Sequence, residues 1–340
     1  MIVALDAQLA IGTATGIGVY QRDLAGALRE RGVDVRVLSA GWLDPWRFDR
    51  RVLWDQVLFP LAIARSGAAV VHATAGTLPF VQSLPTVVTV HDMAWLRVQG
   101  HTHGYARAYF GTAMRRTYRR AAAVVVDSVF SRDEYLALGA DRRTPHVVYP
   151  GVDARYAAIV RRPDDAPFAL VVGTLEARKN LLAAVDATAA IPELRLIAVG
   201  PPTPYAAHVR ARIAELGIGE RVELRGYVDR ATLDELYARA ALALIPSRYE
   251  GFGYAVAEAR CAGLPFVATR GSSLTEVAED AGILVDPHDP AGWTDAIRAL
   301  LADRRGADVR AAQDRARANE RFRWTTAAAA LEAVYAAAIR

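Results

Sequence analysis

Two carboxylates and two glycines occur close together in one stretch of the sequence. Glu250-Gly251-Phe252-Gly253 follows an apolar run at 241–245, and Glu258 comes eight residues after the first glutamate. Glycine lets the backbone turn sharply and approach a ligand closely, and the first N–H groups of a following helix point outward at that ligand. The stretch therefore predicts an anion-binding helix start flanked by two hydroxyl-accepting carboxylates, an arrangement that suits a sugar nucleotide.

The two glutamates are expected to serve different parts of such a ligand. Glu250 lies before the helix and Glu258 in its second turn, so they do not share one helix face. We expect Glu258 to bind ribose hydroxyls and Glu250 to bind hexose hydroxyls, with the backbone N–H groups of Phe252, Gly253 and Tyr254 on sugar or phosphate. A structural explanation also fits, because glycines after a strand make tight turns and the helix dipole favours an early glutamate.

A pair of consecutive cations, Arg178 and Lys179, follows another apolar strand at 169–172. Ligands of open α/β sheets bind beyond the carboxyl ends of the strands. Cations there can stabilise the negative charge that grows on a diphosphate leaving group, and they do so more in the transition state than in the ground state. We therefore expect Lys179 and Arg178 to be catalytic, and Gly173 and Thr174 of the same loop to bind the donor.

These residues need a scaffold, and the sequence predicts two series of alternating strands and helices. The first series opens with a strand at 2–5, a helix with Leu24 and Leu28 on one face, and a strand at 35–38; the second opens at Phe168. A chain of 340 residues is long for one hydrophobic core. We predict an N-terminal domain at 1–153, a polar linker with two prolines at 154–167, a C-terminal domain at 168–322 and a last helix at 323–340.

Composition excludes several classes of protein. The single cysteine, Cys261, excludes an intramolecular disulfide. No apolar stretch reaches the roughly 18 residues of a membrane span, and the first residues carry no basic leader, so we expect a cytoplasmic protein. The net charge of +4 fits anionic substrates or an anionic membrane surface. No helix-turn-helix, zinc or aromatic-platform signature indicates nucleic acid as a partner.

A glycine loop at 12–18 follows the first strand, but it does not match the dinucleotide fingerprint. Gly16-Ile17-Gly18 lacks the third glycine of G-x-G-x-x-G, and no acidic residue ends the second strand. An NAD-dependent enzyme is excluded on that ground.

The EGFG stretch with Glu258 closely resembles the signature of the retaining glycosyltransferases of family 4, within the group 1 glycosyl transferases, and the resemblance covers nearly the whole chain. It implies a GT-B fold, in which two Rossmann-like, doubly wound parallel-sheet domains face each other across a cleft. It also implies metal-independent transfer of a hexose from a nucleoside diphosphate sugar to a saccharide or lipid-linked saccharide, with no cofactor. The GTLEARKN and HD sequences favour GDP-mannose, ahead of UDP and dTDP sugars, and a mannosyltransferase of polysaccharide biosynthesis.

The resemblance implies further site residues. In the family the histidine of an HD dipeptide lies beneath the donor sugar, so we expect His91 to be catalytic. Thr174 stands where many members have an arginine, and Lys179 is therefore the firmer match of the two loop cations. The remaining donor contacts implied are Gly16 and Gly18 near the transferred sugar, and Tyr227 and Val228 along the nucleotide base.

Several interpretations stay open. The segment 42–65 mixes tryptophans with arginines, and the arginines at 115–116 and 119–120 share a helix face. Each is explained by a helix that covers the sheet and faces solvent, or by peripheral contact with the inner face of a membrane and a lipid-linked acceptor. The alternatives to a transferase are a sugar-nucleotide epimerase of the same architecture and a non-catalytic nucleotide-sugar-binding protein.

Overall fold

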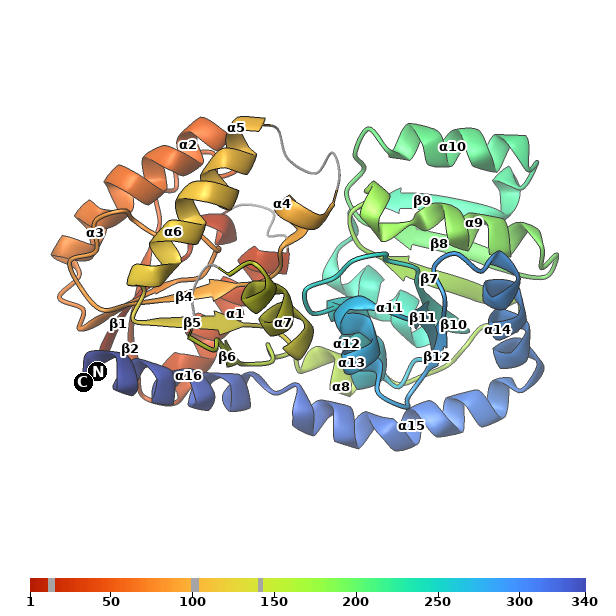
Figure 1. Cartoon of the computed structure of the whole chain (residues 1–340). Coiled ribbons are helices and arrows are strands. Elements are labelled where there is room, and N and C mark those ends of the chain that lie inside the picture. Colours follow the sequence, from red (N-terminus) through yellow and green to blue (C-terminus); the bar gives the residue numbers. More distant parts are fainter. Residues whose placement is uncertain (12–15, 99–103, 140–142) are drawn as a thin grey trace. The chain divides into compact units, whose positions relative to one another are not determined.

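The computed structural model describes residues 1–11, 16–98, 104–139 and 143–340 (Figure 1). By their internal contacts these residues form two compact units. Unit 1 consists of Met1–Gly151 and Phe322–Arg340, and unit 2 consists of Val152–Arg321. Each unit contains a six-stranded sheet whose strands are all paired in parallel, with helices on both faces. The predicted pair of doubly wound α/β domains is confirmed.

Unit 1 has the strand order β2-β1-β3-β4-β5-β6. Its strands are short and rich in valine, as expected for parallel strands that are buried on both faces. The strands are β1 (Ile2–Asp6), β2 (Asp34–Leu38), β3 (Val70–Ala73), β4 (Thr86–Val90), β5 (Ala123–Val126) and β6 (His146–Val147). The helices are η1 (Gln8–Ala10), α1 (Gly16–Glu30), α2 (Phe48–Leu53), η2 (Trp54–Leu58), α3 (Phe59–Arg65), α4 (Ala94–Arg97), α5 (Gly104–Arg107), η3 (Ala108–Met114), α6 (Arg115–Thr117), η4 (Tyr118–Arg120), α7 (Val129–Ala137) and α16 (Trp324–Ile339).

The alternation of side chains along β1 separates two cores in unit 1. Val3 and Leu5 face α1 and α16, whereas Ala4 faces the helical segment 48–65 that contains Trp54. The segment 48–65 therefore covers the sheet, as one of the two interpretations of its sequence required. Among the described residues, no helix is both long and apolar enough to cross a membrane.

Unit 2 has the strand order β12-β11-β10-β7-β8-β9. Strands β8 and β9 are added on one side of β7, and β10, β11 and β12 are added on the other, so the strand order reverses between the neighbours β7 and β10. The strands are β7 (Phe168–Val172), β8 (Arg195–Val199), β9 (Val222–Gly226), β10 (Leu242–Ile245), β11 (Phe266–Thr269) and β12 (Ile283–Val285). The helices are α8 (Arg155–Ala158), η5 (Ala177–Lys179), α9 (Leu181–Ala189), α10 (Ala206–Glu215), η6 (Gly219–Arg221), α11 (Arg230–Arg239), α12 (Tyr254–Ala262), α13 (Ser272–Ala278), α14 (Pro290–Ala302) and α15 (Arg304–Arg321).

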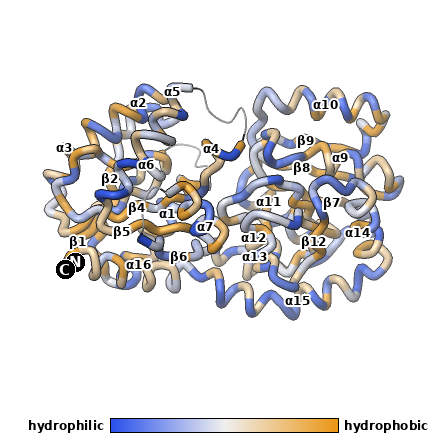
Figure 2. The backbone as a smooth tube through the Cα atoms, in the orientation of Figure 1, coloured by the Kyte–Doolittle hydropathy of each residue, from blue (hydrophilic) through white to orange (hydrophobic). Residues whose placement is uncertain are grey.

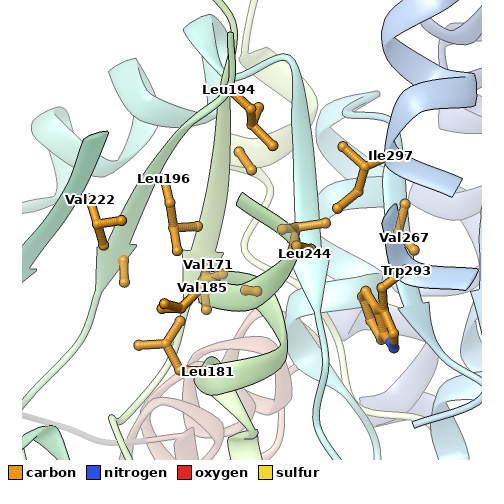
Figure 3. Packing of buried hydrophobic residues seen from close by; sticks show 14 of the residues in the cluster. Val171, Leu181, Val185, Leu194, Leu196, Val222, Leu244, Val267, Trp293 and Ile297 are labelled. Atoms are coloured by element: carbon orange, nitrogen blue, oxygen red, sulfur yellow. The ribbon is translucent and has the colours of Figure 1, made fainter. Parts of the chain in front are cut away.

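A hydrophobic cluster fixes the position of the central strands of unit 2. Val171 of β7 and Leu244 of β10 lie between the side chains of α9 and α14, including Val185 and the fully buried Trp293 (Figure 3). Figure 2 shows hydrophobic residues along the strands, whereas the surface helix α15 is hydrophilic over much of its length. The two strands pair in parallel, with Leu242 opposite Ala169 and Ala243 opposite Leu170, so both run toward the same edge of the sheet.

The predicted linker, 154–167, is not a free connection, because it belongs to unit 2 and contains α8. Arg161 donates to the carbonyls of Ala238 at 3.1 Å and Ala240 at 2.7 Å, at the end of α11. The backbone N–H of Arg162 also donates to the Ala238 carbonyl, at 2.8 Å. Polar composition suggested a linker, but these arginine side chains and backbone groups satisfy carbonyls that α11 leaves without a helical partner.

The chain passes between the units at 151–152 and again at 321–322. Within unit 1 the two passages are in contact, since a Cβ atom on Gly151 would lie 2.3 Å from the indole of Trp324. Within unit 2 they are joined by Arg315 of α15, which donates to the carbonyls of Ala157 and, at 2.8 Å, Ile159.

The fold of unit 2 predicts a severe cost for a side chain at Gly200. This residue has φ +150°, and a Cβ atom on it would lie 2.0 Å from the carbonyl oxygen of Gly173, a backbone atom that cannot rotate away. We expect Gly200→Ala to lower the free energy of unfolding by about 2 to 4 kcal/mol. Gly219→Ala is the control, because a Cβ atom there meets nothing within 4 Å. Denaturant unfolding measures both variants, and equal stabilities would contradict the prediction.

Candidate functional site

The loops that follow β7 and β10 meet at the point where the strand order of unit 2 reverses. The backbone N–H of Arg248, after β10, donates to the carbonyl of Arg178, after β7, at 2.8 Å. This contact brings η5, which carries Arg178 and Lys179, to the segment that carries Glu250. Three of the predicted catalytic residues are therefore brought together at the sheet edge where α/β folds bind ligands.

Glu250 is held between the two cations. Lys179 Nζ lies 2.5 Å from one carboxylate oxygen, and Arg178 Nη1 lies 3.0 Å from the other. Burial of the carboxyl, which is 8% exposed, opposes ionisation, but Lys179 and Arg178 outweigh it and lower the pKa of Glu250 to about 2. The arrangement is a fixed, fully ionised cluster, and Arg178 extends it to Glu176 at 2.8 Å.

Lys179 reaches back over the end of β7 to make this contact. Gly173 has φ +144°, and a Cβ atom on it would touch Lys179 Cε at 3.5 Å. Gly173 and Thr174 line a pocket with Lys179, Ser247 and Ala255. The loop residues predicted to bind the donor thus lie beside the lysine.

The start of α12 is shaped by Gly253. This residue has φ +93°, and a Cβ atom on it would lie 2.6 Å from a methyl group of Leu274. It caps the helix without a side chain, so no side-chain oxygen occupies the helix start. The N–H groups of a first helical turn have no acceptor within the helix and carry partial positive charge. Gly253 and Tyr254, which follow Gly251 and the buried Phe252, thus lie at the helix start that the sequence predicts to bind an anion.

Glu258 lies among different partners from Glu250. The hydroxyl of Tyr237 donates to its Oε2 atom at 2.9 Å, and the hydroxyl of Tyr156 also favours its charged form. Burial raises the pKa of Glu258 to about 7, although these phenols and Arg155 favour the charged form. The structure thus separates the two glutamates, and only Glu250 is ionised at every pH near neutrality.

In unit 1, His91 follows β4 and forms an ion pair with Asp127, which follows β5. The two ring nitrogens lie 2.6 Å from Asp127 Oδ2 and 2.7 Å from the carbonyl oxygen of Thr74. The carbonyl oxygen and an ionised Asp127 can only accept, so this arrangement favours a His91 that carries hydrogens on both nitrogens. Burial disfavours this charge, but Asp127 and the Thr74 carbonyl outweigh it and raise the pKa of His91. The neighbouring Asp92 accepts from the backbone N–H of Ala94 at 2.9 Å.

Other predicted residues lie outside these clusters. Gly16 and Gly18 are in the first turn of α1, so the predicted glycine loop ends earlier than expected, and 12–15 lie outside the described residues. Tyr227 is exposed and, with Val228, follows β9, which β8 separates from β7.

Two features of the site were missed in the sequence. Tyr156 and Tyr237, the partners of Glu258, gave no spacing signal. The second feature was visible: Lys179 is the only lysine among 41 lysine and arginine residues. A chain that uses arginine everywhere else retains one ammonium group at the strand-order reversal. A compact ammonium and a planar guanidinium are not interchangeable, so a single lysine at this edge of the sheet indicates a role that arginine would not fill.

Two family models match the chain. Residues 153–321 match the glycosyl transferases group 1, and residues 14–156 match glycosyltransferase family 4. A D-inositol 3-phosphate glycosyltransferase from Xylanimonas cellulosilytica is 34% identical over 281 residues, which is 76% of this chain and 67% of that protein. The O-antigen chain mannosyltransferase B of Escherichia coli is 28% identical, over 70% of this chain and 66% of its own length.

Solved structures share the fold. Sucrose-phosphate synthase from Thermosynechococcus elongatus superposes with a TM-score of 0.82 at 22% identity, covering 99% of this chain and 98% of its own. HepE from Anabaena, solved in complex with UDP-glucose, has a TM-score of 0.78 at 19% identity, covering 99% and 100%. The predicted GT-B fold is confirmed by the two parallel-sheet units and these neighbours.

The His91–Asp127 pair predicts an unusual titration. Asp127 and the Thr74 carbonyl raise the pKa of His91, so it should lose its second ring proton at a higher pH than an ordinary histidine of pKa 6.5. The stability contributed by the pair is then present below pH 6.5 and is lost as pH rises through the folded pKa. Nitrogen-15 NMR of labelled protein, assigned with His91→Gln, measures both states. Asp127→Asn should move the titration of His91 to lower pH, whereas Asp92→Asn should move it less; unchanged titration in Asp127→Asn would refute the pairing.

Proposed function

We propose that this chain, which belongs to the glycosyl transferases of group 1 and has a family 4 N-terminal region, is a hexosyltransferase. It transfers the hexose from a nucleoside diphosphate sugar to a hydroxyl of a saccharide or lipid-linked saccharide. One observation carries the proposal. Lys179 and Arg178 flank Glu250 beside the start of α12, so two cations and a positive helix end lie at one place. A diphosphate is the ligand chemistry that matches this charge.

The same residues account for bond cleavage without a divalent metal. As the glycosidic bond breaks, its electron pair moves onto a phosphate oxygen, and the cations stabilise the charge that develops there. Glu250 accepts from hexose hydroxyls, Glu258 accepts from the ribose, and His91 is the candidate from unit 1 for orienting the sugar. We infer retention of configuration, with the leaving phosphate taking the proton of the acceptor hydroxyl on the face from which it departs.

GDP-mannose is the first candidate donor, and UDP-glucose is the second. The first is supported by the GTLEARKN and HD sequences and by the similarity to a mannosyltransferase of O-antigen chains. The second is supported by HepE, a structural neighbour solved with UDP-glucose. Thermal unfolding with each donor discriminates them, since a ligand that binds the folded state raises the midpoint of unfolding.

The proposal is tested through the single lysine. Besides the terminal amine, Lys179 carries the only amine in the chain, so acylation followed by mass spectrometry reports its accessibility directly. GDP-mannose or UDP-glucose should protect Lys179 but not the amine of Met1. Lys179→Ala should lower the rate of sugar transfer by about 10²- to 10³-fold, because it removes charge stabilisation from the transition state. Arg225→Ala, at an exposed pair with Glu223, is the control.

Three outcomes would overturn the proposal. Unchanged transfer by Lys179→Ala would remove the assigned role of the lysine. Conversion of a sugar nucleotide incubated alone would favour an epimerase, and donor binding without turnover on any acceptor would favour a nucleotide-sugar-binding protein.

We also propose peripheral contact of unit 1 with an anionic membrane. On the helical segment 48–65, Leu53, Val57 and Leu61 recur every four residues and are 40 to 48% exposed. The segment 104–120 packs beside it, with the rings of Phe48 and Tyr105 4.8 Å apart, and carries the exposed Arg116, Arg119 and Arg120. Apolar side chains next to arginines suit the headgroup region of an anionic bilayer.

Vesicle flotation tests this contact. The protein should float with vesicles that contain anionic lipid and not with neutral ones. Val57→Asp combined with Leu61→Asp should reduce binding about tenfold or more, because it removes apolar contacts and adds negative charge. Val160→Asp, at a 78% exposed position in unit 2, is the matched control. Equal flotation of both variants would exclude the 48–65 surface.

A further inference from the structure

Two buried phenols act on the carboxylate of Glu258 from outside its own helix. Tyr237 of α11 donates to Oε2 at 2.9 Å, and the Tyr156 hydroxyl of α8 favours the charged form of the same carboxylate. The two rings meet edge to face, with centroids 5.0 Å apart. Glu258 is thereby fixed between α8, α11 and α12 by contacts that come from three separate parts of the sequence.

The tyrosines reach a ligand only through Glu258. Tyr156 is 2% exposed and Tyr237 is 1% exposed, whereas Glu258 is partly exposed. Arg155 strengthens the arrangement, because its Nη2 atom donates to the Tyr156 hydroxyl at 3.0 Å and its guanidinium lies 4.7 Å above the ring. A phenol that accepts from a cation becomes a better donor to the carboxylate on its other side.

The number of lone-pair positions on the Glu258 carboxylate indicates which ligand groups it can bind. A carboxylate has about four lone-pair positions, and the Tyr237 phenol fills one of them. The positions that are left can accept from the two vicinal hydroxyls of a ribose. We propose that Tyr156 and Tyr237 are positioning residues for the donor nucleotide, because they orient Glu258 so that its remaining lone pairs accept the two ribose hydroxyls. This inference rests on the proposed function.

The charges around Glu258 give the inference a pH signature. The groups that act on it are Tyr237 of α11, Arg155 and Tyr156 of α8 and Lys179 of η5, all of which favour its charged form. On α12 itself, Arg260 is occupied by Asp314 of α15 at 2.7 Å and Glu279 at 2.6 Å. The elements packed against α12 carry further charged groups, among them Asp234 of α11, Glu276 of α13 and Arg315 of α15.

Loss of either phenol should therefore raise the pKa of Glu258 further above about 7. Ribose hydroxyls donate best to the ionised carboxylate, so nucleotide binding should weaken as pH falls through that value. In Tyr156→Phe and Tyr237→Phe, this weakening should begin at higher pH than in the wild type.

Calorimetric titration with GDP and UDP and with their 2′,3′-dideoxy analogues, from pH 6 to 9, tests the inference. Each Tyr→Phe variant should bind the ribonucleotides about 3- to 10-fold more weakly and bind the dideoxy analogues as the wild type does. In transfer assays the donor KM should rise while kcat stays nearly constant. Tyr118→Phe is the matched control, because it removes a buried phenol of unit 1 that donates to the Gly76 carbonyl.

The outcomes separate this inference from the proposed function. Equal weakening of ribonucleotide and dideoxynucleotide binding would show that the tyrosines have a merely structural role, and it would overturn the inference. Unchanged binding by the variants would overturn it as well. In both cases nucleotide binding by the wild type would leave the proposed function standing. Failure of the wild-type chain to bind either nucleotide or to transfer sugar would overturn the proposed function as well.

Discussion

Paired charge at the junction of β7 and β10 is the constraint on which the rest of unit 2 depends. Glu250 is buried, and a buried carboxylate is tolerated only when opposite charges and hydrogen bonds compensate its lost hydration. Lys179 and Arg178 supply that compensation, and to do so their loop must come within hydrogen-bonding distance of the loop after β10. Glycine at positions 173, 200 and 253 permits this approach, because a Cβ atom at each would touch or overlap a neighbouring loop or helix.

In unit 1 the partly buried titratable group is a histidine, and its positive charge is compensated by a carboxylate and a carbonyl oxygen. His91 lies between a carboxylate and a carbonyl oxygen, so its protonation follows from the identity of its neighbours. Each unit therefore holds a titratable group at the carboxyl ends of its strands whose neighbours favour its charged form. Glu258 differs, since burial there outweighs its hydrogen-bond donors, and its charge depends on pH.

Sequence reasoning found the parts of the site that lie directly after strands. Lys179, Arg178 and Glu250 could be predicted to meet, because parallel strands end at one edge and the apolar runs before these residues are unambiguous. It could not find Tyr156 or Tyr237, which are far apart in the chain and meet only through the packing of α8 and α11 on α12. The stretch 154–167 is a related case, since part of its polarity comes from Arg161, whose side chain donates to helix carbonyls that the sequence alone does not reveal.

The two passages of the chain have a consequence for folding. Residues that follow the second sheet contribute one helix, α15, to unit 2 and another, α16, to unit 1. Within unit 1, Gly151 packs on Trp324, and within unit 2, Arg315 joins α15 to the end of α8. Loss of the last two helices would therefore remove packing partners from both units, so the final stretch of this chain must be synthesised before either unit can complete its fold.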